Sequence, residues 1–221
     1  MFKNRTEAGK LLADKLQYAL IDALPLKTVI VALPRGGVTV AVEIAKKMSA
    51  TLTVLVAKKI GAPNQKEFAI GAVSSSGVVV LNDDTGIPHF LLRAYIDSEK
   101  NRLANLTKQA ESEWLASAGL NNQVDFRGTR AIVIDDGVAT GMTTIAAERS
   151  LRQLGASEVY LAAPVVAAET ARTLRNSYDH VISITEPTNM GAVGFFYEDF
   201  HQISDEEVKL ALSTYRQPEL D

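Results

Sequence analysis

The sequence predicts an α/β fold: a doubly wound, mainly parallel sheet flanked by helices, with a small hood or loop appendage. Short runs of β-branched residues recur along the 221-residue chain, as in strands that are buried on both faces. Segments with helical spacing separate these runs, which is the pattern of parallel βαβ units. We expect a single domain over residues 1–221, with its core at about 28–185.

The first part of the chain predicts one complete βαβ unit. Leucines recur at helical spacing within residues 6–22, which indicates a helix. The β-branched run 28–34 ends at a proline and predicts a buried strand. Residues 38–48 form an amphipathic helical pattern, and residues 52–59 predict a second buried strand. These two strands are expected to lie parallel in one sheet.

The middle of the chain is less regular. Residues 60–77 are rich in glycine, serine, proline and asparagine, so we expect a long excursion that can hold one short strand. Residues 78–82 follow as a strand and a candidate hairpin partner. A long charged helix is expected over 90–118. This helix either covers the functional site or forms a subunit contact, for example in a homodimer.

The last part of the chain alternates between strand and helix. Each helix is bounded by a stop or start signal, such as the glycine that ends one of them and the N-cap Ser204 that begins another. The predicted strands are 129–136, 158–165 and 180–185, and the predicted helices are 142–156, 167–176 and 204–215.

Composition excludes several classes of function. The formal net charge is −3, so a general electrostatic attraction to nucleic acid is not expected. The chain has no cysteine, which excludes disulfides, thiolate metal sites and cysteine nucleophiles. No apolar run approaches the ~18 residues of a membrane helix, and the first residues lack a signal segment. We therefore expect a cytoplasmic protein with no nucleic-acid or membrane partner.

The stretch AIVIDDGVATGMTT at 131–144 predicts an anion site. It leads from a buried strand into a loop that opens a helix, where unpaired N–H groups and the helix dipole attract a phosphate. Asp135 and Asp136 would repel a phosphate that touched them, so they must face hydroxyl groups or a divalent cation. A ribose phosphate meets both needs. The alternative is a buried strand that ends on solvated aspartates.

The same stretch resembles the signature of the type I phosphoribosyltransferases, and the motifs PRGG and KKIGAP…EFAIGAV resemble an uncharacterised subgroup of that family. The resemblance implies an enzyme of nucleotide metabolism that binds 5-phosphoribosyl 1-pyrophosphate (PRPP). Mg²⁺ would be held mainly by this substrate, with Asp135 and Asp136 nearby and binding the ribose hydroxyls. The loop that would hold the 5′-phosphate consists of Gly137, Val138, Ala139, Thr140 and Gly141, with Thr143 and Thr144 as further donors.

PRPP also carries a pyrophosphate, which requires a second anion site. The stretch ALPRGGV at 32–38 offers the guanidinium of Arg35 and the amides of Gly36 and Gly37. In the resembling family the loop after the first core strand binds pyrophosphate, often through a cis peptide, which here would lie at Pro34–Arg35. The alternative is a helix-opening turn with a solvated arginine.

Two further parts of the site follow from the resemblance. A mobile loop after the second strand, at about 58–77, would close over the reacting centre and exclude water. Lys58 and Lys59 are the cations there that could neutralise the leaving pyrophosphate. A C-terminal hood at 186–221 would hold the acceptor. Its candidate stacking residues are Phe195, Phe196 and Tyr197, which could instead anchor the last helix.

The expected activity is transfer of a 5-phosphoribosyl group from PRPP to a nitrogen acceptor, such as a nucleobase or a related amine, with release of pyrophosphate. Arg35 and Mg²⁺ would stabilise the leaving group. The alternative is a regulatory protein that binds PRPP or a nucleotide and catalyses nothing.

Overall fold

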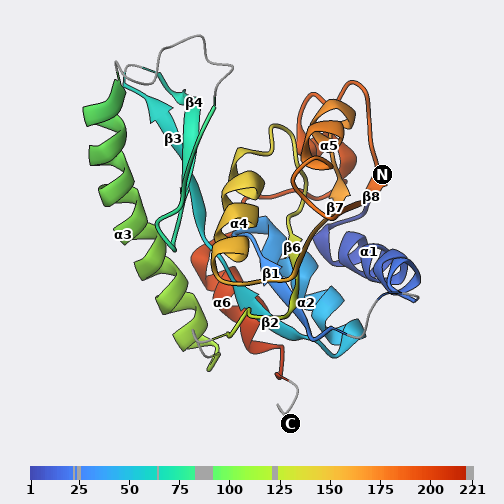
Figure 1. Ribbon diagram of the computed structural model, residues 1–221. Coiled ribbons are helices and arrows are strands. Elements are labelled where there is room, and N and C mark those ends of the chain that lie inside the picture. Colours follow the sequence, from blue (N-terminus) through green and yellow to red (C-terminus); the bar gives the residue numbers. More distant parts are fainter. Residues whose placement is uncertain (22, 24–25, 64, 83–91, 121–123, 218–221) are drawn as a thin grey trace.

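The computed structural model of the chain describes residues 1–221 apart from 22, 24–25, 64, 83–91, 121–123 and 218–221, and Figure 1 shows its arrangement. Five strands form one parallel sheet in the order β2-β1-β6-β7-β8. This confirms the predicted doubly wound, mainly parallel sheet. The strands are Thr28–Ala32 (β1), Thr51–Val54 (β2), Arg130–Ile134 (β6), Glu158–Val165 (β7) and His180–Thr185 (β8).

Helices cover both faces of this sheet, and each face has its own hydrophobic core. The covering helices are Arg5–Ala19 (α1), Gly36–Met48 (α2), Met142–Gln153 (α4), Ala168–Leu174 (α5) and Asp205–Ser213 (α6). Ile30 and Ile132 point to the face of α1, α2 and α6. Their neighbours Val31 and Val133 point to the face of α4 and α5. This alternation follows from the two-residue period of a strand.

A second sheet stands beside the first (Figure 1). It is antiparallel, with the order β3-β4-β5, and it packs against the long helix α3. Residues 60–77 therefore form much of a hairpin, where the sequence predicted a long excursion with one short strand. The elements are Ala57–Ala62 (β3), Gln65–Ser74 (β4), Val79–Leu81 (β5) and Arg93–Ser117 (α3).

The predicted strand 52–59 is split between the two sheets. β2 ends at Val54 and β3 begins at Ala57, so the chain leaves the parallel sheet at residues 55–56. The predicted helix over 90–118 is present as α3, although residues 90–91 lie outside the described part of the chain. Among the helices of the described residues, none combines the length and the apolar character needed to cross a membrane.

Glu111 joins α3 to the base of the hairpin. Its Oε2 accepts hydrogen bonds from the Val56 N–H, at 2.9 Å, and from the Ser75 hydroxyl. Val56 precedes β3 and Ser75 follows β4, so a single carboxyl group ties both ends of the hairpin to the helix. Burial raises the pKa of the Glu111 carboxyl, although these hydrogen bonds oppose the shift.

We predict that Glu111→Gln increases stability more at pH 8 than at pH 5. The folded-state pKa of Glu111 is raised, so its contribution to stability is full below the unfolded-state pKa and is lost as the pH rises through the folded-state value. Glutamine keeps an acceptor oxygen and carries no charge. Urea unfolding at about pH 5 and pH 8 measures the difference. Glu113→Gln, at an exposed position of the same helix, is the control, and an equal effect of Glu111→Gln at both pH values would contradict the prediction.

Candidate active site

The two predicted anion loops lie side by side at the carboxyl ends of the two central strands. β1 and β6 pair in parallel, with Ala32 opposite Ile134, and the strand order reverses direction between them. Such a switch point is where ligands bind in doubly wound sheets. The loop after β1 leads directly into α2, which begins at Gly36, and the loop after β6 contains the acid pair.

Only glycine fits where these loops touch. A Cβ atom on Gly36 would lie 1.8 Å from Oδ2 of Asp136. A Cβ atom on Gly37 would lie 2.5 Å from the carbonyl oxygen of Ile134. Both distances are shorter than any real contact, so the two glycines allow the loop backbones to approach each other. The PRGG motif is therefore explained by packing as well as by its amides.

Arg35 turns toward the C-terminal segment. The peptide bond between Pro34 and Arg35 is cis, at the position that the family resemblance indicated. The guanidinium donates from Nη1 to the carbonyl oxygen of Ile203, at 3.2 Å, and its Nε lies 3.0 Å from Oδ1 of Asp205. The side chains of Arg35 and Asp205 are 44% and 46% exposed. Arg35 thus belongs to the rim of the site and links it to the start of α6.

The acid pair is held by backbone and side-chain donors. Oδ1 of Asp135 accepts the N–H of Asp136 at 2.8 Å, and the Tyr197 hydroxyl donates to the carbonyl oxygen of Asp136 at 2.6 Å. Nε of Arg5 donates to Oδ2 of Asp136 at 2.7 Å. Burial, with the neighbouring charge of Asp136, raises the pKa of Asp135 well above its ordinary value. Holding these two carboxyl groups ionised side by side therefore lowers the stability of the folded protein, and a bound cation or hydroxyl donors would reduce that loss.

Arg5 is the residue that the sequence did not reveal. It lies 131 positions before Asp136, in the first turn of a helix, and nothing in its local pattern marks it. Its Nη1 donates to the carbonyl oxygen of His201 at 3.0 Å, and its guanidinium lies 3.9 Å from the centre of the Phe200 ring. Arg5 thereby joins α1 to the segment before α6.

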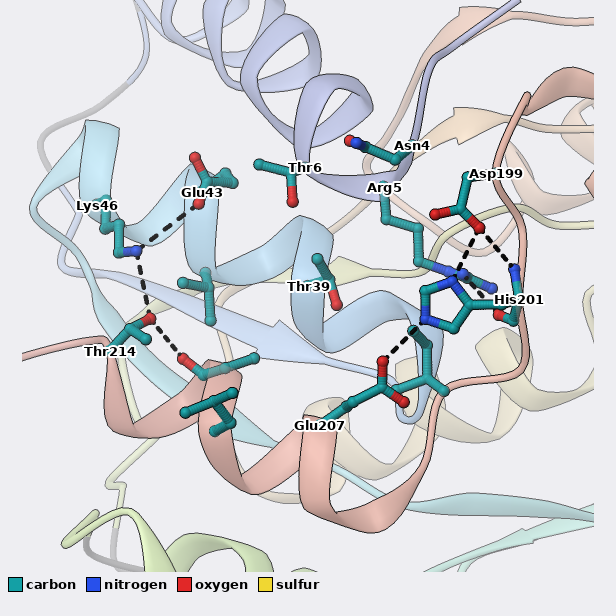
Figure 2. A pocket seen from close by; sticks show the side chains of 14 residues that line it. Asn4, Arg5, Thr6, Thr39, Glu43, Lys46, Asp199, His201, Glu207 and Thr214 are labelled. Atoms are coloured by element: carbon teal, nitrogen blue, oxygen red, sulfur yellow. Dashed lines mark hydrogen bonds and ion pairs between the residues drawn. The ribbon is translucent and has the colours of Figure 1, made fainter.

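A cavity of about 420 Å³ lies between α1, α2 and α6, and Arg5 is one of the residues that line it. Figure 2 shows His201 at one end of it, between Asp199 and Glu207. Nδ1 of His201 is 2.9 Å from Oδ1 of Asp199, and Nε2 is 2.8 Å from Oε1 of Glu207. The two carboxylates raise the pKa of His201, because each favours the protonated imidazolium. This histidine thus fastens the segment before α6 to the first turn of that helix.

The loop at 137–141 opens α4 with unused N–H groups. Gly141 precedes the helix with a φ of 75°, and a Cβ atom there would lie 3.0 Å from Cγ2 of Thr170. Within the described residues, the N–H groups of Ala139 and Thr140 have no hydrogen-bond partner. Together with the first N–H groups of the helix they are donors without an intramolecular partner, which is the feature on which the predicted anion site depends.

Other members of this loop have structural contacts. The N–H of Val138 donates to the Val165 carbonyl oxygen at 2.9 Å, which fixes the loop to β7. The Thr144 hydroxyl is buried and donates to the Gly141 carbonyl oxygen at 2.7 Å. Thr140 is exposed and Thr143 is half-buried, so these are the threonine hydroxyls nearer to solvent. Gly137 lies against Val193, where a Cβ atom would be 2.3 Å from Cγ1.

The register of β3 separates the two candidate lysines. Lys58 pairs with Val73, which packs toward α3, and Lys59 pairs with Ala72, which packs against Met142 of α4. Directly paired residues share a face of the sheet, so Lys58 points to the side of α3 and Lys59 to the side of α4. Both lysines are exposed. Only Lys59 therefore lies on the face that borders the phosphate loop.

The three candidate aromatic residues of the hood differ in their surroundings. Val193–Phe196 forms a short 3-10 helix (η3). Tyr197 is buried, with its ring 5.2 Å from that of Phe2 and 4.9 Å from that of Phe200, so it anchors the hood. Phe196 is half-buried. Phe195 is 76% exposed, and among these three it alone presents its ring to solvent.

The acid pair fits the chemistry of Mg²⁺ held jointly with a substrate. Within the described residues there is no cluster of three or more histidine, cysteine, aspartate or glutamate side chains that could hold a metal ion alone. Mg²⁺ commonly binds through one or two carboxylates together with substrate phosphates and water. Asp135 and Asp136 match that donor set.

Comparisons with known proteins show the family to which this chain belongs. Residues 5–199 match the family model described as phosphoribosyl transferase domain. Two Mycobacterium tuberculosis proteins, Rv0571c and MT0597, whose names assign them provisionally to the phosphoribosyl transferases, are each 38% identical over 209 residues. The match covers 94% of this chain and 45% of theirs, so the chain spans about half the length of these relatives. The crystal structure of TT1426 from Thermus thermophilus is 32% identical with a TM-score of 0.77, and the match covers 97% of this chain and 98% of that one.

We predict that the same isosteric change at the two acids has opposite effects on stability. Asp135→Asn removes a carboxylate whose pKa is raised by desolvation and by the charge of Asp136, so it should stabilise the protein at neutral pH. The gain should disappear at about pH 3, below the unfolded-state pKa of an aspartate, ~3.9. Asp136→Asn leaves the buried Arg5 without its carboxylate and should destabilise by roughly 1–3 kcal/mol. Thermal unfolding measures both, and shifts of the same sign at neutral pH would contradict this prediction.

Proposed function

We propose that this chain, which belongs to the phosphoribosyl transferase family, transfers the 5-phosphoribosyl group of PRPP to a nitrogen acceptor and releases pyrophosphate. The acceptor is a nucleobase or a related amine. The observation that carries this proposal is the close contact between the start of α2 and the acid pair after β6, where Gly36 lies against Asp136. This order of groups suits a ligand with anionic groups at both ends and hydroxyl groups between them.

Each end of PRPP has its own site in this proposal. The N–H groups of Ala139 and Thr140, with the helix start that follows, bind the 5′-phosphate. The amides of Gly36 and Gly37 bind the pyrophosphate. Arg35 can join them, because its pair with Asp205 is solvent-exposed and such pairs contribute at most about 1 kcal/mol. Asp135 and Asp136 accept hydrogen bonds from the ribose hydroxyls.

The reaction exchanges one bond at C1 of the ribose. The C1–O bond breaks and both electrons leave with the pyrophosphate, while the lone pair of the acceptor nitrogen forms the C1–N bond and that nitrogen loses a proton. Positive charge develops on the sugar as the bond breaks, and the nearby acid pair stabilises it electrostatically. Mg²⁺, when bound, neutralises charge on the phosphates of PRPP.

The hairpin and the hood supply the remaining groups. Lys59 lies on the hairpin face that borders α4 and can neutralise the leaving pyrophosphate. Movement of the hairpin over the ligand would exclude water from the activated sugar. Phe195 is exposed and follows Val193, whose side chain lies against Gly137 of the loop after β6. This position suits Phe195 for stacking on a planar acceptor.

The proposal is tested by pyrophosphate release from PRPP and Mg²⁺ across a panel of nucleobases and small amines. We expect release that depends on one acceptor, and loss of release in the double variant Asp135→Asn with Asp136→Asn. Calorimetry with PRPP accompanies the assay. Tight binding without release for any acceptor would favour a regulatory PRPP-binding protein, and failure to bind PRPP would overturn the proposal.

A matched pair of variants tests the hairpin. We predict that Lys59→Ala lowers kcat for pyrophosphate release roughly tenfold or more, because a cation that stabilises the leaving group is lost. Lys58→Ala, one position away on the opposite face, should stay within about twofold of the wild type. Steady-state kinetics with saturating PRPP measures both. Equal losses, or a larger loss at Lys58, would contradict the assignment from strand register.

A further inference from the structure

Arg5 makes the closest charged contact to the acid pair. Its Nε lies 2.7 Å from Oδ2 of Asp136, and the two side chains are only 8% and 14% exposed. The pair is therefore shielded from solvent, where a charge-assisted hydrogen bond is stronger than at the surface. It joins the first turn of α1 to the loop after β6.

The surroundings of Arg5 fix it in this place. The ring of Phe200 lies 3.9 Å from its guanidinium, and the carbonyl oxygen of His201 accepts from Nη1 at 3.0 Å. The residues before α1 pair with the hood, since the N–H of Phe2 donates to the Phe196 carbonyl oxygen at 2.8 Å. In the same ladder the N–H of Asp199 donates to the Lys3 carbonyl oxygen at 2.9 Å. Arg5 is thus held between two segments that are far apart in the sequence.

Asp136 is restrained from the other side as well. Its Oδ2 occupies the space that a Cβ atom on Gly36 would fill, and its carbonyl oxygen accepts from the Tyr197 hydroxyl at 2.6 Å. Nε of Arg5 donates a hydrogen bond to Oδ2, and together with the contact at Gly36 this bond restrains the orientation of the carboxyl group. Within the described residues no N–H group donates to Oδ1 of Asp136. That oxygen is the one that can accept from a ligand.

We infer that Arg5 is a positioning residue of the reaction, which acts through Asp136 by fixing the carboxylate so that its second oxygen meets a ribose hydroxyl. The inference rests on the proposed function. It assigns a role in the site to the N-terminal helix and to the hood, because both hold Arg5. Arg5 itself is 7% exposed and is not expected to touch the substrate.

A double-mutant cycle tests this role. The variants are Arg5→Gln, Asp136→Asn and the combination, and the ligands are PRPP with Mg²⁺, ribose 5-phosphate and pyrophosphate. We expect Arg5→Gln to weaken binding of PRPP and ribose 5-phosphate about tenfold, and binding of pyrophosphate less than about twofold. In the Asp136→Asn background, Arg5→Gln should cause no further loss for any ligand. Arg5→Lys, which keeps the charge but not the planar donor, should restore part of the affinity.

Asn4→Ala controls for a merely structural role of Arg5. It removes the cap of α1, in which Oδ1 of Asn4 accepts the Glu7 N–H at 2.9 Å, and should lower Tm while leaving ribose 5-phosphate affinity within about twofold. All titrations are made below the Tm of every variant. Equal weakening of all three ligands, unchanged binding, or additive losses in the cycle would overturn the inference and leave the proposed function standing. Failure of the wild-type protein to bind PRPP would overturn both.

Discussion

The close contact between the loops after β1 and β6 is the constraint on which the rest of the site depends. Gly36 has no side chain, and the space where a Cβ atom would lie is filled by Oδ2 of Asp136, with Nε of Arg5 only 2.9 Å from the same point. An alanine at position 36 would displace the side chains of this ion pair. One missing methyl group thus allows an anion-binding loop, an acid pair and a buried arginine to share one edge of the sheet.

The elements around this edge are joined to it by specific contacts between distant segments. The residues before α1 pair with the hood, and within the hood His201 joins the segment before α6 to Glu207 of that helix. On the opposite side, Glu111 ties the hairpin to α3. The hairpin and the hood are the parts that would contact the ligands in the proposed reaction, and each is attached to the body through a carboxyl group. Movement of either part would have to break these attachments as well as its apolar contacts with the neighbouring elements.

The sheet and the position of the loop at 137–141 between a strand and a helix could be predicted because local pattern determines them. The β-branched runs at 28–34 and 129–136 became the central strands β1 and β6, and the position of the cis peptide followed from the family resemblance. The sequence predicted one short strand where the structure has a hairpin. Ile70 lies in a bulge, between Gly71, which pairs with Ile60, and Ala69, which pairs with Gly61, and this bulge breaks the alternation that marks a strand. Arg5 could not be found, since its partner is 131 residues away and only the folded chain brings them together. The choice between Lys58 and Lys59 likewise needed the strand register.

The acid pair indicates how function and stability oppose each other in this chain. Desolvation of Asp135, followed by the neighbouring charge of Asp136, raises the pKa of the Asp135 carboxyl, so holding both groups ionised here lowers stability. Arg5 offsets part of it at Asp136, and Tyr197 and the backbone hold the remaining geometry. A packed core alone would favour a neutral residue at position 135. The carboxyl group is more easily understood if a ligand with hydroxyl groups or a cation regularly occupies the site, because such a ligand turns the repulsion into binding free energy.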